Sequence, residues 1–234
     1  MNPPAAPDHA MRSVPGTRHV VNQDAVGCDP GLGLWLVADG MGGHAAAEVA
    51  SSLARDTVLR EVGAGAALAD AVATANLALQ TAARQDRPRA GMGTTIAAVQ
   101  LHDRQANVVW AGDSRVYRLQ AGRLACLTRD HSLVQYLVDR GTITAEEAAM
   151  HPRRHVLMSA LGLADVIIGT TRVPLQAGDR LLLCSDGITG MLDHARIEAL
   201  LAAAPDAAAA AEALTREERA LDGPDDASAV VIHI

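Results

Sequence analysis

A short apolar run closed by an acid and glycines decides the fold: Gly33-Leu-Trp-Leu-Val-Ala-Asp-Gly-Met-Gly-Gly-His44. An unbroken apolar run of this length is typical of a buried strand, which we expect over Gly33–Ala38. Asp39 follows at the end of that strand, and Gly40 beside it allows another part of the backbone to come close. The same arrangement recurs at Asp186-Gly187, after a second apolar run. We therefore expect carboxylates at the ends of two buried strands.

Outward from this strand the sequence alternates between helical and extended patterns. Helices are expected over residues 45–62, 66–84, 132–140, 193–204 and 206–221, and the capping box Thr144-Ala-Glu-Glu147 opens a further short one. Asp193 and Asp206 are the expected N-caps of the last two. Short β-branched segments predict strands over residues 94–101, 105–111, 115–119, 124–127, 166–173, 180–184 and 229–234. Runs of strands and paired helices favour an α+β fold over a doubly wound parallel sheet.

The composition excludes several functions. The chain has 234 residues and a formal net charge of −7, and all 20 of its basic residues are arginines. Without lysine there can be no Walker-type phosphate-binding lysine, no kinase lysine and no Schiff base. The acidic balance, with no aromatic residues among the arginines, argues against nucleic-acid binding. A hydrophobic content of 49% is ample for one core, which must be built from aliphatic residues because phenylalanine is absent.

The N-terminus and the cysteines indicate the setting of the protein. Residues 1–12 are proline-rich and polar, which predicts a flexible lead before a single domain over 13–234. Three widely separated cysteines, at positions 28, 126 and 184, indicate reduced thiols in a cytoplasmic protein. No apolar stretch approaches the ~20 residues of a membrane span, so no membrane partner is expected.

Further acids occupy positions next to strands. Asp113 follows the apolar run 108–112, Asp225 and Asp226 directly precede the last strand, and Asp24 opens an expected strand. Each acid taken alone is more often part of a plain turn, and it is the recurrence of the pattern that favours a shared site. If they converge, they raise one another's pKa unless a cation lies between them. A set of oxygen ligands favours Mg²⁺ or Mn²⁺ over zinc.

These acids lie in motifs that resemble those of the PPM-type, or protein phosphatase 2C-like, metal-dependent serine/threonine phosphatases in their compact bacterial form. The resemblance runs from about Gly16 to Ile234, with the motifs in the family's order. The motifs are Asn22-Gln23-Asp24, Val37–His44, Gly91–Thr95, Ala111–Arg115, the flap ends Asp130-His131-Ser132 and His151–Arg154, Cys184–Gly187, and Asp225-Asp226. The resemblance implies a four-layer α-β-β-α fold, in which helix pairs flank a central antiparallel β-sandwich and a flap covers about residues 130–161.

The resemblance also implies a set of metal-binding residues. Asp39 would bridge two ions, with the Gly40 carbonyl on one of them and Asp186 and Asp225 on the other. Asp24 would act through bound water.

Asp113 would help to hold a third, weaker ion. The ions would be Mn²⁺ or Mg²⁺, and a metal-bridging water would hydrolyse phosphoserine or phosphothreonine. The implied partners are phosphorylated proteins, the products of serine/threonine kinases, and the implied state is a monomer.

Three positions depart from the family pattern. The family's phosphate-binding arginine falls at His19, with Arg18 one place earlier. Either a bulge restores Arg18 to the site, or His19 binds phosphate in a pH-dependent way. We favour Arg18, because arginine can hold a phosphate with two prongs. Asp226 stands where asparagine is usual, and His155 stands in the flap where asparagine is common.

The leaving oxygen of the substrate needs a proton, and His44 and His151 are the candidate donors. Both have an ordinary alternative, as a helix-start residue satisfied by backbone and as a plain loop residue. The alternative to an active phosphatase is a pseudophosphatase that binds phosphoproteins with little or no turnover. A hydrolase of small phosphate esters is a third hypothesis, and it would need a base-recognition pocket that the sequence does not reveal.

Overall fold

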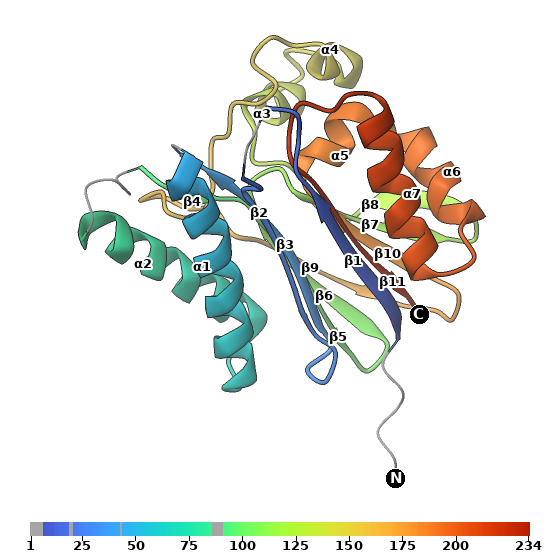
Figure 1. Ribbon diagram of the computed structural model, residues 1–234, viewed down its shortest axis with the longest axis horizontal. Helices are drawn as coiled ribbons and strands as arrows, with labels where there is room; N and C mark the ends of the chain where they lie inside the picture. The colour runs from blue at the N-terminus through green and yellow to red at the C-terminus, as the bar shows by residue number, and fades with distance from the viewer. Residues whose placement is uncertain (1–6, 19–20, 43, 86–90) are drawn as a thin grey trace.

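The computed structural model describes residues 7–18, 21–42, 44–85 and 91–234. Two antiparallel sheets lie between two groups of helices (Figure 1). The strands of the first sheet are, in order, β1 (Asp8–Val14), β11 (Ala227–His233), β10 (Arg180–Cys184), β7 (Arg115–Gln120) and β8 (Arg123–Cys126). Those of the second are β2 (Asp24–Asp29), β3 (Leu34–Met41), β5 (Ile96–His102), β6 (Gln105–Ala111) and β9 (Gly169–Pro174), with β4 (Gly93–Thr94) beside β3.

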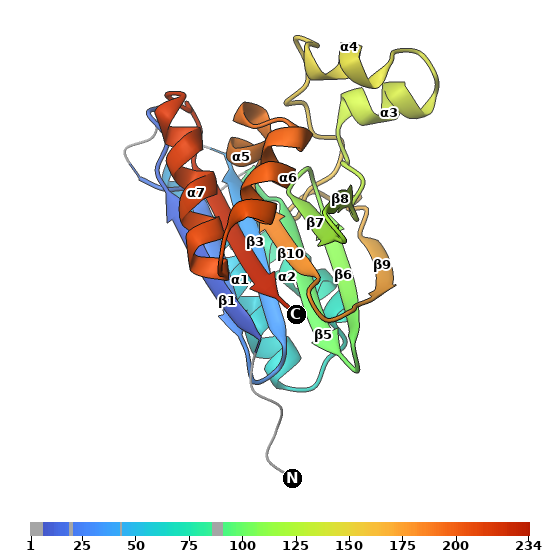
Figure 2. The same ribbon diagram turned by 90° about the vertical axis from the view of Figure 1, so that its right-hand side faces the viewer.

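The helices complete four layers. One face of the sandwich is covered by α1 (His44–Gly63) and α2 (Leu68–Gln85), and the other by α5 (Asp186–Met191), α6 (His194–Ala203) and α7 (Ala207–Ala220). The short helices α3 (Leu133–Asp139) and α4 (Ala145–Ala149) lie beyond the ends of the strands in both views (Figures 1 and 2). The expected α-β-β-α architecture is therefore confirmed. Within the described ranges, every helix is too short or too polar to cross a membrane.

The unbroken apolar run of β3 follows from burial on both faces. Trp35 and Val37 pack into the core between the two sheets, whereas Leu34 and Leu36 pack into the core beneath α1 and α2. Side chains alternate across a strand, so a strand covered on both sides needs apolar residues at every position. A third core fills the space between the first sheet and helices α5–α7. These three cores separate the four layers.

Several elements differ from those predicted by sequence. The predicted flexible lead over residues 1–12 is wrong for its last part, because Asp8–Val14 forms β1 and pairs along its length with β11. β1 is an edge strand with mostly half-buried or exposed side chains, so its sequence carries little apolar signal. The strand expected over residues 94–101 is interrupted at Thr95, and the helix α5 was not expected.

Hydrogen bonds from the Ala111–Arg115 motif hold the start of the flap (residues 130–161) against the sandwich. The Arg115 guanidinium donates two hydrogen bonds to the Asp130 carboxylate, at 2.8 and 2.7 Å. His131 Nδ1 accepts the N–H of Gly112 at 3.2 Å, and Ser132 caps α3 by accepting the N–H of Gln135. A two-pronged, half-buried arginine–carboxylate pair has a fixed geometry, so the flap begins from a defined position.

Candidate active site

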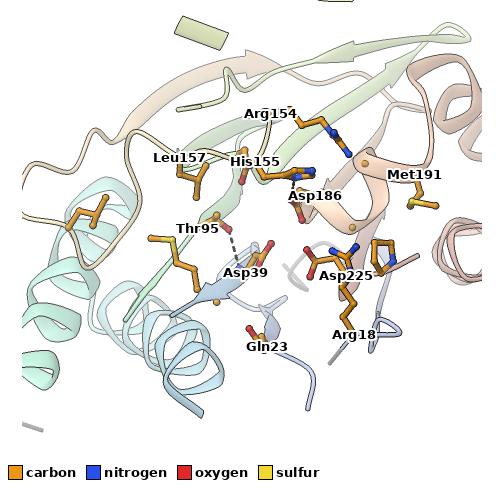
Figure 3. Close-up of a pocket in the computed structure, with 17 residues that line it drawn as sticks. Arg18, Gln23, Asp39, Thr95, Arg154, His155, Leu157, Asp186, Met191 and Asp225 are labelled. Carbon is orange, nitrogen blue, oxygen red and sulfur yellow. Dashed lines mark hydrogen bonds and ion pairs between the residues drawn. The ribbon is translucent and has the colours of Figure 1, made fainter. Parts of the chain in front are cut away.

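A cleft of about 730 Å³ lies at the end of the sandwich nearest the flap, and all the predicted metal-binding residues except Asp24 line it (Figure 3). Asp39 comes from β3, Asp113 from the turn after β6, Asp186 from the start of α5 just after β10, and Asp225 from the segment before β11. The Gly40 backbone also lines the cleft. Residues from both sheets, far apart in sequence, thus converge on one space, as the strand-end positions predicted.

Asp24 is the one predicted metal residue that does not line the cleft. It pairs directly with Asp39 in the register of β2 and β3. Its Oδ2 accepts hydrogen bonds from the hydroxyls of Ser185, at 2.7 Å, and Ser228, at 2.6 Å. Its Oδ1 is buried and has no hydrogen-bond partner in the described part of the chain. One oxygen is therefore fixed by two serines, and the other has an unused lone pair.

The Gly-Thr-Thr motif positions the Asp39 backbone. The Asp39 N–H donates to Thr95 Oγ1 at 3.1 Å, and the Asp39 carbonyl accepts from the Thr95 N–H and the Thr94 hydroxyl, each at 2.9 Å. Thr95 Oγ1 also shares a hydrogen bond of 2.6 Å with Ser114 Oγ, next to Asp113. The interruption between β4 and β5 therefore serves to link the Asp39 and Asp113 segments.

Both Asp-Gly pairs allow the close backbone approach that the sequence predicted. A Cβ on Gly40 would lie 2.1 Å from the carbonyl oxygen of Ala47 in α1. A Cβ on Gly187 would lie 2.1 Å from the carbonyl oxygen of Asp226. Both distances are far below van der Waals contact, so any side chain at either position would push the adjacent aspartate out of place.

Burial and mutual repulsion dominate the electrostatics of the cleft. Burial raises the pKa of Asp39 well above its usual range, and the charges of Asp24, Asp186 and Asp113 raise it further. Burial likewise raises the pKa of Asp24, although its two serine hydrogen bonds oppose the shift. Burial and the charge of Asp186 raise the pKa of Asp113 to about 8. The cluster is thus costly to ionise unless a cation compensates it.

The donor set fits hard divalent ions that keep part of their water shell. Within the described residues, no three His, Cys, Asp or Glu side chains are arranged so that they alone could hold a metal ion. Mg²⁺ commonly binds through one or two carboxylates and retains several waters. Two buried oxygens, Asp24 Oδ1 and Asp186 Oδ1, have no hydrogen-bond partner in the same part of the chain. The carboxylates and the Gly40 carbonyl offer only oxygen ligands, the kind that Mg²⁺ and Mn²⁺ prefer.

Arg18 borders the cleft on the side of Asp225 (Figure 3). Its backbone N–H donates to the Pro224 carbonyl at 3.1 Å, and the N–H of Thr17 donates to the Gly223 carbonyl at 3.2 Å. These bonds hold the Arg18 segment against the turn that carries Asp225. His19, the other candidate for phosphate binding, lies outside the described residues.

The histidines occupy different places around the cleft. His44 begins α1, three residues after Met41 at the end of β3, and its side chain lies outside the described part. His151 is in the flap, where its Nδ1 accepts the Arg153 N–H at 3.1 Å, and it does not line the cleft. His155 does line the cleft, with Nδ1 3.7 Å from Asp186 Oδ2, and this carboxylate raises the pKa of the imidazole. The sequence marked His155 only as a departure from the pattern.

Comparison with known proteins agrees with this geometry. The family model described as Protein phosphatase 2C matches residues 16–222, and the chain belongs to that family. The chain is 39% identical over 233 residues to the serine/threonine protein phosphatase PstP of Mycobacterium tuberculosis, covering 97% of this chain but only 45% of that relative. It is 35% identical over 208 residues to the serine/threonine phosphatase stp of Listeria innocua, covering 84% of this chain and 82% of the relative.

A solved structure extends the similarity to three dimensions. The crystal structure of the catalytic domain of PstP in complex with two manganese ions matches with a TM-score of 0.87 and 35% identity, over 96% of both chains. The family and fold inferred from the motifs are therefore confirmed.

Proposed function

We propose that this chain is a metal-dependent protein phosphatase that hydrolyses phosphoserine and phosphothreonine. The observation that carries the proposal is the convergence of four aspartates on one cleft, with Arg18 at its edge. The names of the relatives, which are serine/threonine phosphatases, support the same reaction. An intact carboxylate set favours turnover over the pseudophosphatase alternative, since a module that only bound phosphate would gain nothing from so costly a cluster.

In this proposal the carboxylates hold the ions and the rest of the cleft holds the substrate. Asp39, Asp186 and Asp225 are the main metal ligands, together with the Gly40 carbonyl. Asp24 and Asp113 have supporting roles, Asp24 through water and Asp113 toward a third ion. When bound, such ions lower the pKa of water and stabilise the charge that develops on a phosphoryl group. The two manganese ions in the PstP structure support manganese as the metal.

Arg18 is the proposed phosphate clamp, since a guanidinium offers two parallel N–H donors to a phosphoryl group. His44 and His151 remain the proposed donors of a proton to the leaving oxygen. Phosphorylated proteins are the proposed partners, and a monomer in the cytoplasm is the proposed state. The three cysteines are free, which suits a reducing compartment.

The decisive experiment measures phosphate release from a phosphothreonine peptide. We expect turnover with Mn²⁺, none with EDTA, and a loss of at least about a hundredfold in kcat for Asp39→Asn, because the variant removes charge that the ions require. Asp29→Asn is the matched control, because Asp29 lies at the far end of the same β2–β3 hairpin. Turnover that survives EDTA would exclude the metal mechanism, and no Mn²⁺-dependent turnover would exclude the function.

A second comparison identifies the phosphate clamp. Arg18→Ala is expected to raise KM for the phosphopeptide by about tenfold or more, because a two-pronged ionic contact to phosphate is lost. His19→Ala is expected to change KM much less. If His19→Ala raises KM more than Arg18→Ala does, the assignment of the clamp is wrong, and the effect of His19→Ala should then depend on pH.

A further inference from the structure

Asp226 stands next to the proposed ligand Asp225, yet its side chain does not line the cleft. It is 2% exposed. Its two carboxylate oxygens point instead to the N-terminal segment. Oδ1 accepts the N–H of Gly16 at 2.8 Å, and Oδ2 accepts the N–H of Gln23 at 2.7 Å. Asp226 thus holds the segment that contains Arg18 at two points, one on each side of the arginine.

The backbone of Asp226 is itself fixed to the carboxylate cluster. The Ser185 hydroxyl lies 3.4 Å from the Asp226 carbonyl oxygen and 2.7 Å from Asp24 Oδ2. Gly187 approaches the same carbonyl so closely that a Cβ there would lie 2.1 Å from it. The residue therefore connects the segment that carries Arg18 to the start of β2, which carries Asp24, and to the start of α5, which carries Asp186.

The two hydrogen bonds explain why an aspartate suits this position. A carboxylate accepts hydrogen bonds at both oxygens, so it can satisfy two backbone N–H groups at once. An asparagine has one acceptor oxygen, and its NH₂ group would face the second N–H without an acceptor between them. Asparagine, the usual residue in the family pattern, would thus leave either Gly16 or Gln23 without its partner.

We propose that Asp226 is a positioning residue for phosphate recognition, which acts by holding the Arg18 segment at a fixed distance from the metal-binding carboxylates. This inference rests on the proposed function, because it assumes that Arg18 binds the phosphoryl group. It assigns Asp226 no contact with substrate or metal. The effect of Asp226 must therefore pass through Arg18, and it must appear in substrate binding more than in chemistry or metal affinity.

Amide hydrogen exchange tests the two hydrogen bonds from Gly16 and Gln23 to the Asp226 carboxylate without any assay of activity. In the wild-type protein the amides of Gly16 and Gln23 should exchange slowly, although neither residue lies in a strand. Asp226→Asn should speed the exchange of at least one of them. The matched control is Asp179→Asn, since Asp179 is 3% exposed and also accepts a backbone N–H, that of Gln176, at the opposite end of β10. It should leave both amides unchanged. Rapid exchange of either amide in the wild type would overturn the proposal.

Enzyme kinetics then test whether these two hydrogen bonds affect binding of the phosphorylated substrate. Asp226→Asn should raise KM for a phosphothreonine peptide by about tenfold. The kcat and the Mn²⁺ concentration for half-maximal activity should stay within about twofold of the wild type. In an Arg18→Ala background the same change should raise KM by less than about twofold, because the residue it positions is gone. Additive effects on KM, or a shift in the Mn²⁺ requirement with KM unchanged, would overturn the proposal.

Failure of the proposed function can be told apart from failure of this inference. If the wild type has no Mn²⁺-dependent turnover, the proposed function fails, and calorimetric titration with inorganic phosphate in the presence of Mn²⁺ replaces the kinetic test. Asp226→Asn should then weaken phosphate binding by about tenfold, and Arg18→Ala should abolish that difference. Equal phosphate affinity in wild type and Asp226→Asn would refute the positioning role.

Discussion

At the scale of single residues, the buried acids differ in what compensates their charge. Asp226 accepts two backbone N–H groups, and Asp179 accepts the Gln176 N–H and the side-chain amide of Gln120. Glu218 in α7 is also buried, at 2% exposed, but its Oε1 has no hydrogen-bond partner in the described part of the chain. A buried carboxylate without such partners costs free energy when it is ionised.

Glu218→Gln is therefore expected to stabilise the protein at neutral pH. Burial raises the pKa of Glu218, with Arg219 opposing the shift and Asp225 and Asp226 adding to it. Because the folded state holds this proton more tightly, wild-type stability falls relative to the variant as pH rises above the unfolded pKa of about 4.3. A gain of about 1 kcal/mol would raise Tm by roughly 2–4 °C at pH 7.

Thermal unfolding at several pH values checks this expectation. The Tm difference between Glu218→Gln and wild type should shrink toward zero as pH falls to about 4. Glu217→Gln is the neighbouring control, because Glu217 is paired with Arg196 and that pair lowers its pKa. This control should not raise Tm. A Tm for Glu218→Gln at or below that of wild type at pH 7 would contradict the account.

At the scale of elements, the sequence predicted those helices and strands that are determined by interactions between residues close together in the chain. Asp193 and Asp206 cap α6 and α7 as expected, and the capping box at Thr144 opens α4. Each of these contacts joins residues three positions apart, so the sequence contains the whole interaction. The strand β3 was also predictable, because burial on both faces leaves a continuous apolar run.

Elements whose cause is distant in sequence were missed. The strand β1 depends on pairing with β11 at the other end of the chain. The helix α5 spans six residues, two of them glycines, and Ser185 at its N-cap makes no side-chain capping bond. It follows Cys184 at the end of β10, where Gly187 packs against the Asp226 backbone. Neither element has a propensity or periodicity that would have shown it.

The residues of the candidate site likewise fall into those that the sequence could predict and those that it could not. The aspartates were predictable because strand ends and adjacent glycines mark them in the sequence. The flap histidines were not, since whether His151 or His155 reaches the cleft depends on the path of a loop between two distant anchors. The hydrogen bonds of Asp226 to Gly16 and Gln23 were equally invisible, because about 200 positions separate the partners.

At the scale of the whole molecule, the cleft joins the two sheets. Asp39 lies in β3 and Asp113 just after β6 of one sheet, whereas Asp186 follows β10 and Asp225 precedes β11 of the other. The repulsion among these carboxylates therefore acts between the two halves of the sandwich. A cation in the cleft would reverse that repulsion, so metal binding and global stability should be linked.

Without metal, the cluster should make stability depend on pH in a definite direction. Burial and Asp186 raise the pKa of Asp113 to about 8 from an ordinary value of 3.8. Burial raises the pKa of Asp39 as well. The folded state then retains protons that the unfolded chain has released, so stability in EDTA should fall as pH rises from about 4 to about 8. Asp39→Asn replaces a carboxyl that is costly to ionise in the folded state with a neutral amide, so the variant should have a higher Tm than wild type in EDTA at pH 7.5.

Addition of Mn²⁺ should reverse this difference, so that the wild-type protein has a higher Tm than Asp39→Asn. An ion that binds only the folded state contributes about 2.7 kcal/mol at a hundred times its Kd, which corresponds to a rise in Tm of roughly 5–10 °C for a chain of this size. Asp39→Asn should gain much less, because a carboxylate proposed to hold the metal is replaced by a neutral amide. Differential scanning fluorimetry at pH 7.5, with sodium chloride at equal ionic strength as the control, measures both shifts. If the Mn²⁺ shift is no larger than the sodium shift, or is equal in the two proteins, then the carboxylates that join the sheets do not bind the metal, and the mutual repulsion inferred from their pKa values must be compensated in another way.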